Sequence, residues 1–140
     1  MPSIHGILET ALSVADPKRS AVFYRRLFGF ATLLESDRLI ALEVSGAKNV
    51  LLLFQRGVTS SPVQTPGGVI PAHGGIGQGH VTFAIDAAEI PAWRERLNEQ
   101  GIALESTVTW DGGATSLYFR DPDGHLLELM TPGFWKFTQG

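Results

Sequence analysis

Glu128 lies in the middle of an apolar run, a position where a carboxylate is unexpected. Its neighbours Leu126, Leu127, Leu129 and Met130 are typical of a strand that buries at least one face. Removing an ionised carboxylate from water costs several kcal/mol unless a partner compensates its charge. Glu128 is therefore predicted either to reach solvent between buried neighbours or to bind a partner such as a metal ion, whose other ligands come from elsewhere in the chain.

The composition limits what those other ligands can be. The chain has no cysteine, which excludes disulfides, thiolate metal sites and cysteine nucleophiles and leaves His, Asp and Glu as ligands. With 140 residues, 44% of them apolar, the chain is long enough for one domain or two small fused modules around a real core.

The charge pattern indicates which partners to expect. A net charge of -3 without a basic cluster argues against nucleic acid and against a membrane surface as partners. The opening residues lack the pattern of a signal peptide, and no stretch is long and apolar enough to span a bilayer. We therefore expect a cytoplasmic protein with neither of these partners.

The first half of the chain predicts a strand, a helix and three more strands. Residues 7–14 alternate as a strand does, and Asp16 followed by Pro17 is typical of a helix start. Gly29 stands where a left-handed helix cap is needed. The three runs that follow are short and rich in large apolar and β-branched residues, namely residues 30–35, 39–44 and 49–54.

Residues 55–79 contain three prolines and seven glycines without a sustained period. This stretch is predicted to be an irregular connection and to contain the module boundary. After it the same order of elements begins again. A strand over residues 80–85 precedes a helix that starts no earlier than about Ala88, because Pro91 is tolerated only in the first turn, and that ends at Gly101. Strands are then predicted at residues 102–110, 115–120 and 125–130.

The chain is thus predicted to be an internal repeat. Its single domain, residues 1–140, contains two modules of about residues 5–56 and 79–133 joined by the Gly/Pro-rich linker. In the first strand of each module, small or polar side chains on one face alternate with bulky apolar ones on the other. The polar face is expected to open onto a cavity. Glu9 and His80 begin their strands on this face, so they are the candidate partners of Glu128.

Three segments together carry a family resemblance: ETALSVADPKRSAVFYRRLFGF opening the first module, GHVTFAID opening the second and YFRDPDGHLLEL closing it. In this order and spacing they resemble the vicinal oxygen chelate superfamily, the glyoxalase/bleomycin-resistance/extradiol-dioxygenase group. The resemblance implies an α+β fold in which two tandem βαβββ modules form a cupped mixed sheet with helices on its outer face. It also implies metal ligands at Glu9, His80 and Glu128.

The ligand set departs from the superfamily's pattern in two places. The position of Glu9 is often His or Gln in relatives. A fourth ligand, the carboxylate late in the first module of glyoxalase I, falls near residues 51–53, where only leucine is present. Glyoxalase I activity is disfavoured for this reason.

One imidazole and two carboxylates suit a divalent ion such as Mn²⁺, Fe²⁺, Ni²⁺, Co²⁺ or Zn²⁺, with open positions for water or a chelating substrate. The superfamily uses such positions to hold two adjacent oxygens, in reactions that range from isomerisation to ring cleavage and thiol addition. The fold does not choose among them. The predicted function is that of a divalent-metal-dependent small-molecule enzyme (lyase or isomerase, dioxygenase or thiol transferase), with a metal-free protein that sequesters a small molecule or antibiotic as the alternative.

Ser116 and Tyr118 are predicted to face the substrate. A two-residue hairpin at Pro122 and Asp123 would put Leu117 opposite Glu128, whereas one bulge residue moves Ser116 and Tyr118 onto its face. Polarity favours the bulge, because polar side chains suit a wet cavity.

The other histidines have weaker claims to the site. His5 is about 13 Å along the strand from Glu9, too far for both to bind one ion. His125 is expected to act within the turn. His73 is expected to be exposed in the linker, with a lid over the cavity as the alternative.

The working unit is predicted to be a homodimer with shared sites. A connection of 25 residues (55–79) can reach a partner chain. Glu9 would then come from one chain and His80 with Glu128 from the other.

Overall fold

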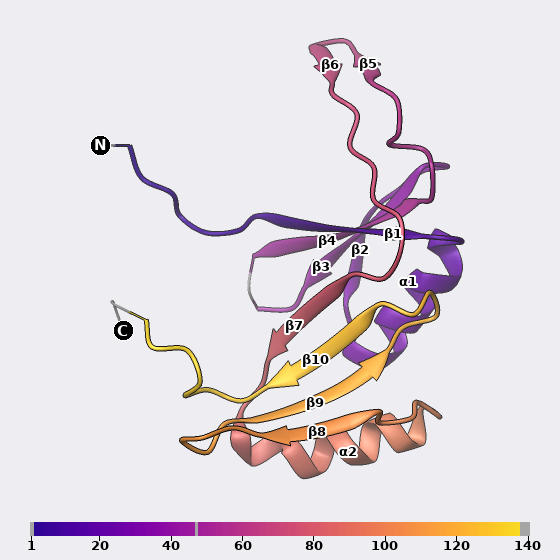
Figure 1. Cartoon of the computed structure of the whole chain (residues 1–140). Helices are drawn as coiled ribbons and strands as arrows, with labels where there is room; N and C mark the ends of the chain where they lie inside the picture. The colour runs from indigo at the N-terminus through magenta and orange to yellow at the C-terminus, as the bar shows by residue number, and fades with distance from the viewer. Residues whose placement is uncertain (1, 47, 138–140) are drawn as a thin grey trace. The chain divides into compact units, whose positions relative to one another are not determined.

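The computed structural model describes residues 2–46 and 48–137. The chain forms two compact units, Met1–Gly77 (unit 1) and Gln78–Gly140 (unit 2), and their boundary falls near the end of the predicted linker. In Figure 1 unit 1 runs from indigo to rose and unit 2 from rose to yellow.

Unit 1 contains the predicted strand, helix and three strands (Figure 1). These elements are β1 (Glu9–Val14), α1 (Pro17–Phe28), β2 (Ala31–Glu35), β3 (Leu39–Val44) and β4 (Asn49–Gln55). The sheet order is β1-β4-β3-β2. β1 is parallel to β4, and the other pairs are antiparallel. The first strand of the module therefore lies beside its last strand.

Local sequence explains where α1 begins and ends. The Asp16 side chain accepts a hydrogen bond from the backbone N–H of Lys18 at 3.0 Å, and Pro17 occupies the first turn, where its missing N–H costs nothing. Gly29 ends the helix at φ 75°, a left-handed conformation that glycine adopts without strain. The buried face, which includes Tyr24 and Leu27, packs against β3 and β4.

Unit 2 repeats the arrangement. Its elements are β7 (His80–Ala84), the 3₁₀ turn η1 (Ala87–Glu89), α2 (Ile90–Glu99), β8 (Ser106–Thr109), β9 (Thr115–Arg120) and β10 (Leu126–Met130). The order β7-β10-β9-β8 matches unit 1, and β7 is again parallel to the last strand. α2 begins at Ile90, within the limit that Pro91 sets. The predicted α+β class with two βαβββ units is therefore confirmed as two four-stranded mixed sheets.

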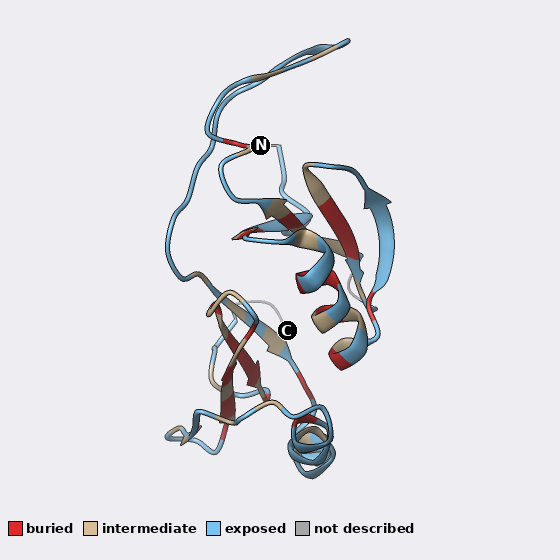
Figure 2. Cartoon of the chain, turned by 90° about the vertical axis from the view of Figure 1, so that its right-hand side faces the viewer, coloured by how far each residue is buried: buried red, intermediate tan, exposed pale blue. Residues whose placement is uncertain are grey.

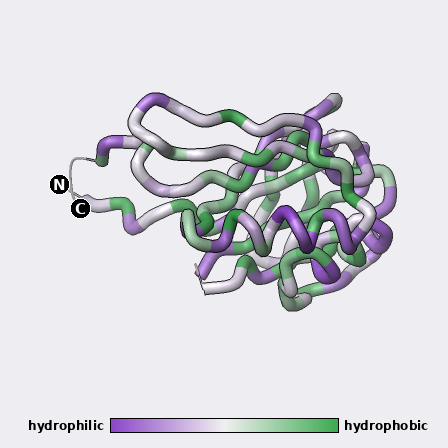
Figure 3. The backbone as a smooth tube through the Cα atoms, turned by 90° about the horizontal axis from the view of Figure 1, so that it is seen from below, coloured by the Kyte–Doolittle hydropathy of each residue, from purple (hydrophilic) through white to green (hydrophobic). Residues whose placement is uncertain are grey.

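The core of unit 2 lies on one face of its sheet. Four side chains from β9 and β10 have no exposed surface, namely Leu117, Phe119, Leu127 and Leu129. Figure 2 shows these strands in red, while α2 is mostly exposed on its outer side. Hydrophobic and hydrophilic residues alternate along the tube in Figure 3, as expected for elements that bury one face. The opposite face of the sheet is left for polar side chains.

Two predictions about secondary structure are wrong. The linker is not irregular throughout, because β5 (Val63–Thr65) and β6 (Gly68–Ile70) form an antiparallel hairpin around Pro66 and Gly67. Its β-branched residues favour strands, and the Thr65 hydroxyl closes the turn by donating to the Gly68 carbonyl at 2.7 Å. The strand predicted from residue 102 starts only at Ser106, because the Ile102 N–H donates back to the Leu97 carbonyl at the end of α2.

Within the described residues, no helix combines the length and the apolar character needed to cross a membrane.

Candidate metal and substrate site

Glu128 lies in the centre of the unit 2 sheet. β10 is flanked by β7 and β9, and the register places Glu128 beside Thr82 on one side and Tyr118 on the other. Only 3% of Glu128 is exposed. The alternative in which Glu128 reaches solvent is therefore wrong, and its charge must be compensated by neighbours.

Hydroxyl groups supply part of that compensation. The Thr82 hydroxyl donates to Oε1 of Glu128 at 3.0 Å, and the Ser116 hydroxyl donates to Oε2. Tyr118 lies directly opposite Glu128 on the neighbouring strand, close enough for the carboxylate to raise the pKa of the phenol. The indole N–H of Trp110 donates to Ser116 Oγ at 2.9 Å, which leaves the serine proton free to point at Glu128. The carboxylate is thus held in one orientation.

His80 brings a nitrogen lone pair to the same carboxylate. Its Nδ1 lies 2.9 Å from the Leu126 carbonyl oxygen, which can only accept, so Nδ1 carries the proton. In a neutral imidazole Nε2 is then an acceptor, and it lies 3.2 Å from Glu128 Oε1. The Thr82 hydroxyl, 3.2 Å from Nε2, already gives its proton to Glu128. The lone pairs of Nε2 and Oε1 therefore face each other, an arrangement in which both atoms could bind one cation.

The geometry fits a metal ion. Two ligand atoms about 2.0–2.2 Å from an ion and about 90–109° apart are separated by about 2.8–3.6 Å, and the 3.2 Å between Nε2 and Oε1 lies in this range. A metal-binding histidine commonly donates its other ring N–H to a backbone carbonyl, as Nδ1 of His80 does here. The His80 side chain is 48% exposed, so the nitrogen is accessible.

Glu9, the third predicted ligand, belongs to unit 1. It begins β1 opposite Val50 of β4, as His80 begins β7 opposite Leu126 of β10. Glu9 is exposed and shares the open face of β1 with Ala11 and Ser13. Across the parts of the chain that the structure describes, no three His, Asp or Glu side chains gather into a metal-binding group. Unit 2 thus supplies two of the three predicted ligands.

Unit 1 has no counterpart of the Glu128 cluster. The register places Leu52 beside Ala11 and Ala41, the positions equivalent to Glu128, Thr82 and Tyr118 in unit 2. Apolar residues replace all three polar ones. This agrees with the expectation that residues 51–53 offer no carboxylate.

The predicted register of the last hairpin is confirmed. Leu117 pairs with Leu129, while Tyr118 is directly opposite Glu128 and Ser116 lies on the same face. Ser116 has no exposed surface and Tyr118 is partly buried. Tyr118 therefore lies on the open face, whereas Ser116, which was also predicted to face the substrate, is buried and donates to the Glu128 carboxylate.

Burial raises the pKa of Tyr118 above its ordinary value of 10.0, and the negative charge of Glu128 raises it further. The phenol consequently stays neutral and keeps its proton for hydrogen bonding. Its ring lies nearly parallel to that of His80, with centroids 6.5 Å apart and an angle of 28° between the planes. Tyr118 and His80 form one side of the same small polar surface.

We expect Tyr118 to ionise only above pH 10. The chain has two tyrosines, so subtracting the ultraviolet pH titration of Tyr118→Phe from that of the wild type isolates this phenol. Because its folded pKa is raised, its contribution to stability is present below the unfolded value and lost as pH rises through the folded one. Glu128→Gln should move the midpoint toward 10. A wild-type midpoint at or below 10 would contradict the contact with Glu128.

Sequence reasoning placed His125 in the turn but missed its contact with the site. His125 is buried, and its Nδ1 accepts a hydrogen bond from the Gly79 N–H at 2.7 Å, next to His80. Thr82 and Trp110 were also missed. Thr82 carried a signal, because it follows His80 by two residues and shares its face. Trp110 gave no such signal in the sequence, because its indole contacts Ser116 only once the hairpin has folded.

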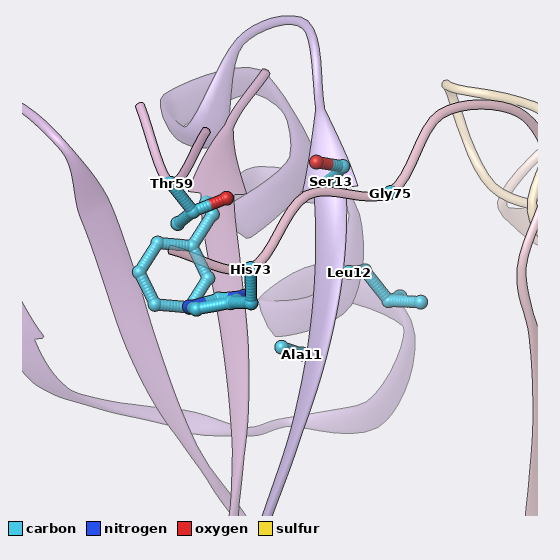
Figure 4. Close-up of a pocket in the computed structure, with 7 residues that line it drawn as sticks. Ala11, Leu12, Ser13, Thr59, His73 and Gly75 are labelled. Atoms are coloured by element: carbon cyan, nitrogen blue, oxygen red, sulfur yellow. The ribbon is translucent and has the colours of Figure 1, made fainter. Parts of the chain in front are cut away.

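His73 is exposed, as expected, but its ring has a partner in unit 1. The ring meets Phe54 edge to face, with centroids 5.2 Å apart and an angle of 79°. Figure 4 shows His73 and Gly75, on the segment that follows β6, beside Ala11, Leu12 and Ser13 of β1. The segment thus lies over the open face of the unit 1 sheet.

Comparisons with known proteins agree with this fold. The model of the Glyoxalase/Bleomycin resistance protein/Dioxygenase superfamily matches residues 6–129. The chain therefore belongs to this superfamily, which confirms the resemblance drawn from its motifs.

Similar proteins in the superfamily carry out different reactions. Metallothiol transferase FosB from Bacillus licheniformis is 26% identical over 131 residues, which cover 91% of this chain and 76% of that protein. Catechol-2,3-dioxygenase from Bacillus subtilis is 30% identical over 136 residues, 92% of this chain but 43% of the dioxygenase. The crystal structure of lactoylglutathione lyase from Agrobacterium tumefaciens matches with a TM-score of 0.86 and 33% identity, covering 97% of this chain and 100% of that one.

Proposed function

We propose that the protein is a divalent-metal-dependent enzyme that acts on a small molecule, with the ion held by Glu9, His80 and Glu128. The observation that carries the proposal is the pairing of His80 and Glu128. Nε2 and Oε1 lie 3.2 Å apart, and the protonated Nδ1 is already engaged by a carbonyl. Glu9 is added because the matching registers of β1 and β7 give it the place that His80 has in unit 2.

The bound ion, Mn²⁺, Fe²⁺, Ni²⁺, Co²⁺ or Zn²⁺, would hold two adjacent oxygens of the substrate and stabilise negative charge that develops on them. The protein supplies the rest. Thr82 and Ser116 fix the carboxylate of Glu128. Tyr118, a neutral phenol on the same face, would contact the substrate, and the buried Ser116 donates to the Glu128 carboxylate.

The names of the relatives give three candidate reactions: thiol transfer, dioxygenation of a catechol and lyase chemistry. Lyase chemistry of the glyoxalase I type needs a carboxylate late in the first module, in addition to the residue at the position of Glu9. The site argues against this reaction, because Leu52 stands at the position equivalent to Glu128. The predicted set of one histidine and two carboxylates is compatible with thiol transfer and with dioxygenation. The reaction is therefore left at the level of chelating adjacent oxygens.

Elemental analysis of the purified protein, followed by titration with each ion, tests the proposal. We expect one divalent ion per site and activity that disappears with a chelator and returns with added metal. A screen of α-ketothioacetals, catechols and phosphonates with a thiol, each with Mn²⁺, Fe²⁺, Ni²⁺ or Zn²⁺, should identify the reaction. A protein that binds none of these ions at millimolar concentration would refute the proposal.

A metal-free binding protein is the second candidate. Its supporting observation is that two hydroxyl groups, those of Thr82 and Ser116, already donate to the Glu128 carboxylate without a metal ion. Such a protein would retain ligand binding in the presence of a chelator, whereas the proposed enzyme would lose it.

We also propose that the protein works as a homodimer with shared sites. Unit 2 supplies His80 and Glu128, so the ligand set is completed by Glu9 from a unit 1, and the proposal assigns that unit 1 to the partner chain. Dimers with two identical sites are the commonest closed assembly of soluble proteins.

A further inference from the structure

Two adjoining hollows lie on the open face of unit 1, and the proposed metal site uses neither. The first, about 90 Å³, is lined in part by Ala11, Phe54 and His73. The second, about 180 Å³, is lined in part by Arg56 and Ser60. Both hollows share Ser13 and Thr59 in their walls. Together they approach the lower end of the roughly 300–1,000 Å³ typical of small-molecule pockets.

The walls of these hollows are held by defined contacts. The His73 N–H donates to the Thr59 carbonyl at 2.8 Å, which joins the segment after β6 to the segment after β4. Arg38 Nη2 donates to the Val58 carbonyl at 3.2 Å. Thr59 is 6% exposed. The segments on either side of the β5–β6 hairpin are therefore held to unit 1 by hydrogen bonds and form a defined surface.

The two hollows differ in chemistry. In the first, the rings of Phe54 and His73 meet at 79°, so a planar group can lie against one ring and meet the edge of the other. In the second, Arg56 brings a positive charge to the wall, which suits a carboxylate or phosphate, and the Ser60 hydroxyl donates to the Gly57 carbonyl at 2.7 Å. Ser13 and Thr59, which line both hollows, connect the two.

The hollows begin close to the predicted metal ligand of unit 1. Ala11 and Ser13 share a strand face with Glu9, at about 7 Å and about 13 Å along β1. We propose that the two hollows form a subsite for an aromatic or conjugated group that carries an anionic substituent. That this subsite adjoins the metal-bound oxygens of the substrate rests on the proposed function. That the hollows bind such a group does not.

Binding of benzoate to the metal-free protein tests the subsite. With EDTA present, aromatic ¹H–¹³C spectra should show the ring signals of Phe54 and His73 shifting as benzoate is added. Benzyl alcohol, which has the ring but no charge, and acetate, which has the charge but no ring, should each bind about tenfold more weakly. Because no metal is present, a failed metal site leaves this result unchanged.

Two variants assign the two ends, and a third serves as the control. His73→Ala should weaken benzoate and benzyl alcohol by about tenfold alike, whereas Arg56→Gln should weaken benzoate by a similar factor and leave benzyl alcohol unchanged. His5→Ala is the matched control, because His5 is an exposed histidine of the same unit. Circular dichroism should show that each variant is folded.

Three outcomes would overturn the proposal. One is the absence of shifts at Phe54 and His73 with benzoate, and another is benzoate affinity that Arg56→Gln does not change. The third concerns location: in protein that holds Mn²⁺, the ion should broaden the proton signals of benzoate. Sharp signals beside bound Mn²⁺ would show that the subsite is remote from the metal.

Discussion

Replacing His80 with Ala should abolish stoichiometric metal binding and leave the fold intact. The imidazole supplies the only nitrogen among the three proposed ligands. Its loss should reduce affinity by more than the roughly 10–100-fold that removal of a residue hydrogen-bonded to a ligand costs. The fold should survive because His80 begins its strand, is exposed and contributes nothing to the buried cluster of Leu117, Phe119, Leu127 and Leu129.

Isothermal titration with Mn²⁺ and Zn²⁺ measures the effect, and thermal unfolding checks the fold. His5→Ala is the control for nonspecific loss of an exposed histidine. Glu128→Gln should also lose the metal, because an amide oxygen carries no charge to balance the ion. Full metal occupancy in His80→Ala would show that the assignment is wrong, whatever the result for Glu128→Gln.

Mixing two variants that each lack a metal ligand should restore metal sites if the sites are shared between chains. Glu9→Ala and His80→Ala each lack one ligand, and neither homodimer has a complete site. In a heterodimer, one of the two sites takes Glu9 from the His80→Ala chain and His80 with Glu128 from the Glu9→Ala chain. Random pairing of equal amounts makes half the dimers mixed, so about a quarter of all sites should be intact.

The measurement is bound metal per chain after the two variants are unfolded together and refolded, compared with each variant refolded alone. Native mass spectrometry of differently tagged chains confirms that heterodimers form. If heterodimers form and no metal is recovered, the three ligands come from within one chain. A monomeric wild-type protein that binds metal would lead to the same conclusion.

Local sequence signals predicted the elements of the fold well. Asp16, Pro17 and Gly29 act directly on the backbone at the ends of α1, and the structure uses all three as expected. The predicted face of Tyr118 was also correct, because polarity favoured the bulged hairpin. The β5–β6 hairpin was missed because glycine and proline suggest a loop and equally well form the turn of a short hairpin.

The site was harder to predict because its partners are distant in sequence. Glu128 could be recognised as unusual, and strand parity brought His80 and Glu9 into consideration. The hydrogen bond from Trp110 to Ser116 and that from Gly79 to His125 depend on how segments cross after folding. No periodicity or spacing in the chain records such contacts. The sequence therefore indicated candidate ligands more readily than the residues that orient them.

The attachment of the linker to unit 1 also sets the length of the tether between the units. The last linker hydrogen bond to unit 1 is at His73, and Gly79 is already bound to His125 in unit 2. Six residue steps, fully extended, reach about 20–22 Å, whereas the 25 residues of the whole connection would reach about 80–90 Å. Residues inserted between Pro66 and Gly67 would therefore enlarge the hairpin without lengthening the tether. The same insertion after Ile76 would add directly to the distance over which the two units can separate.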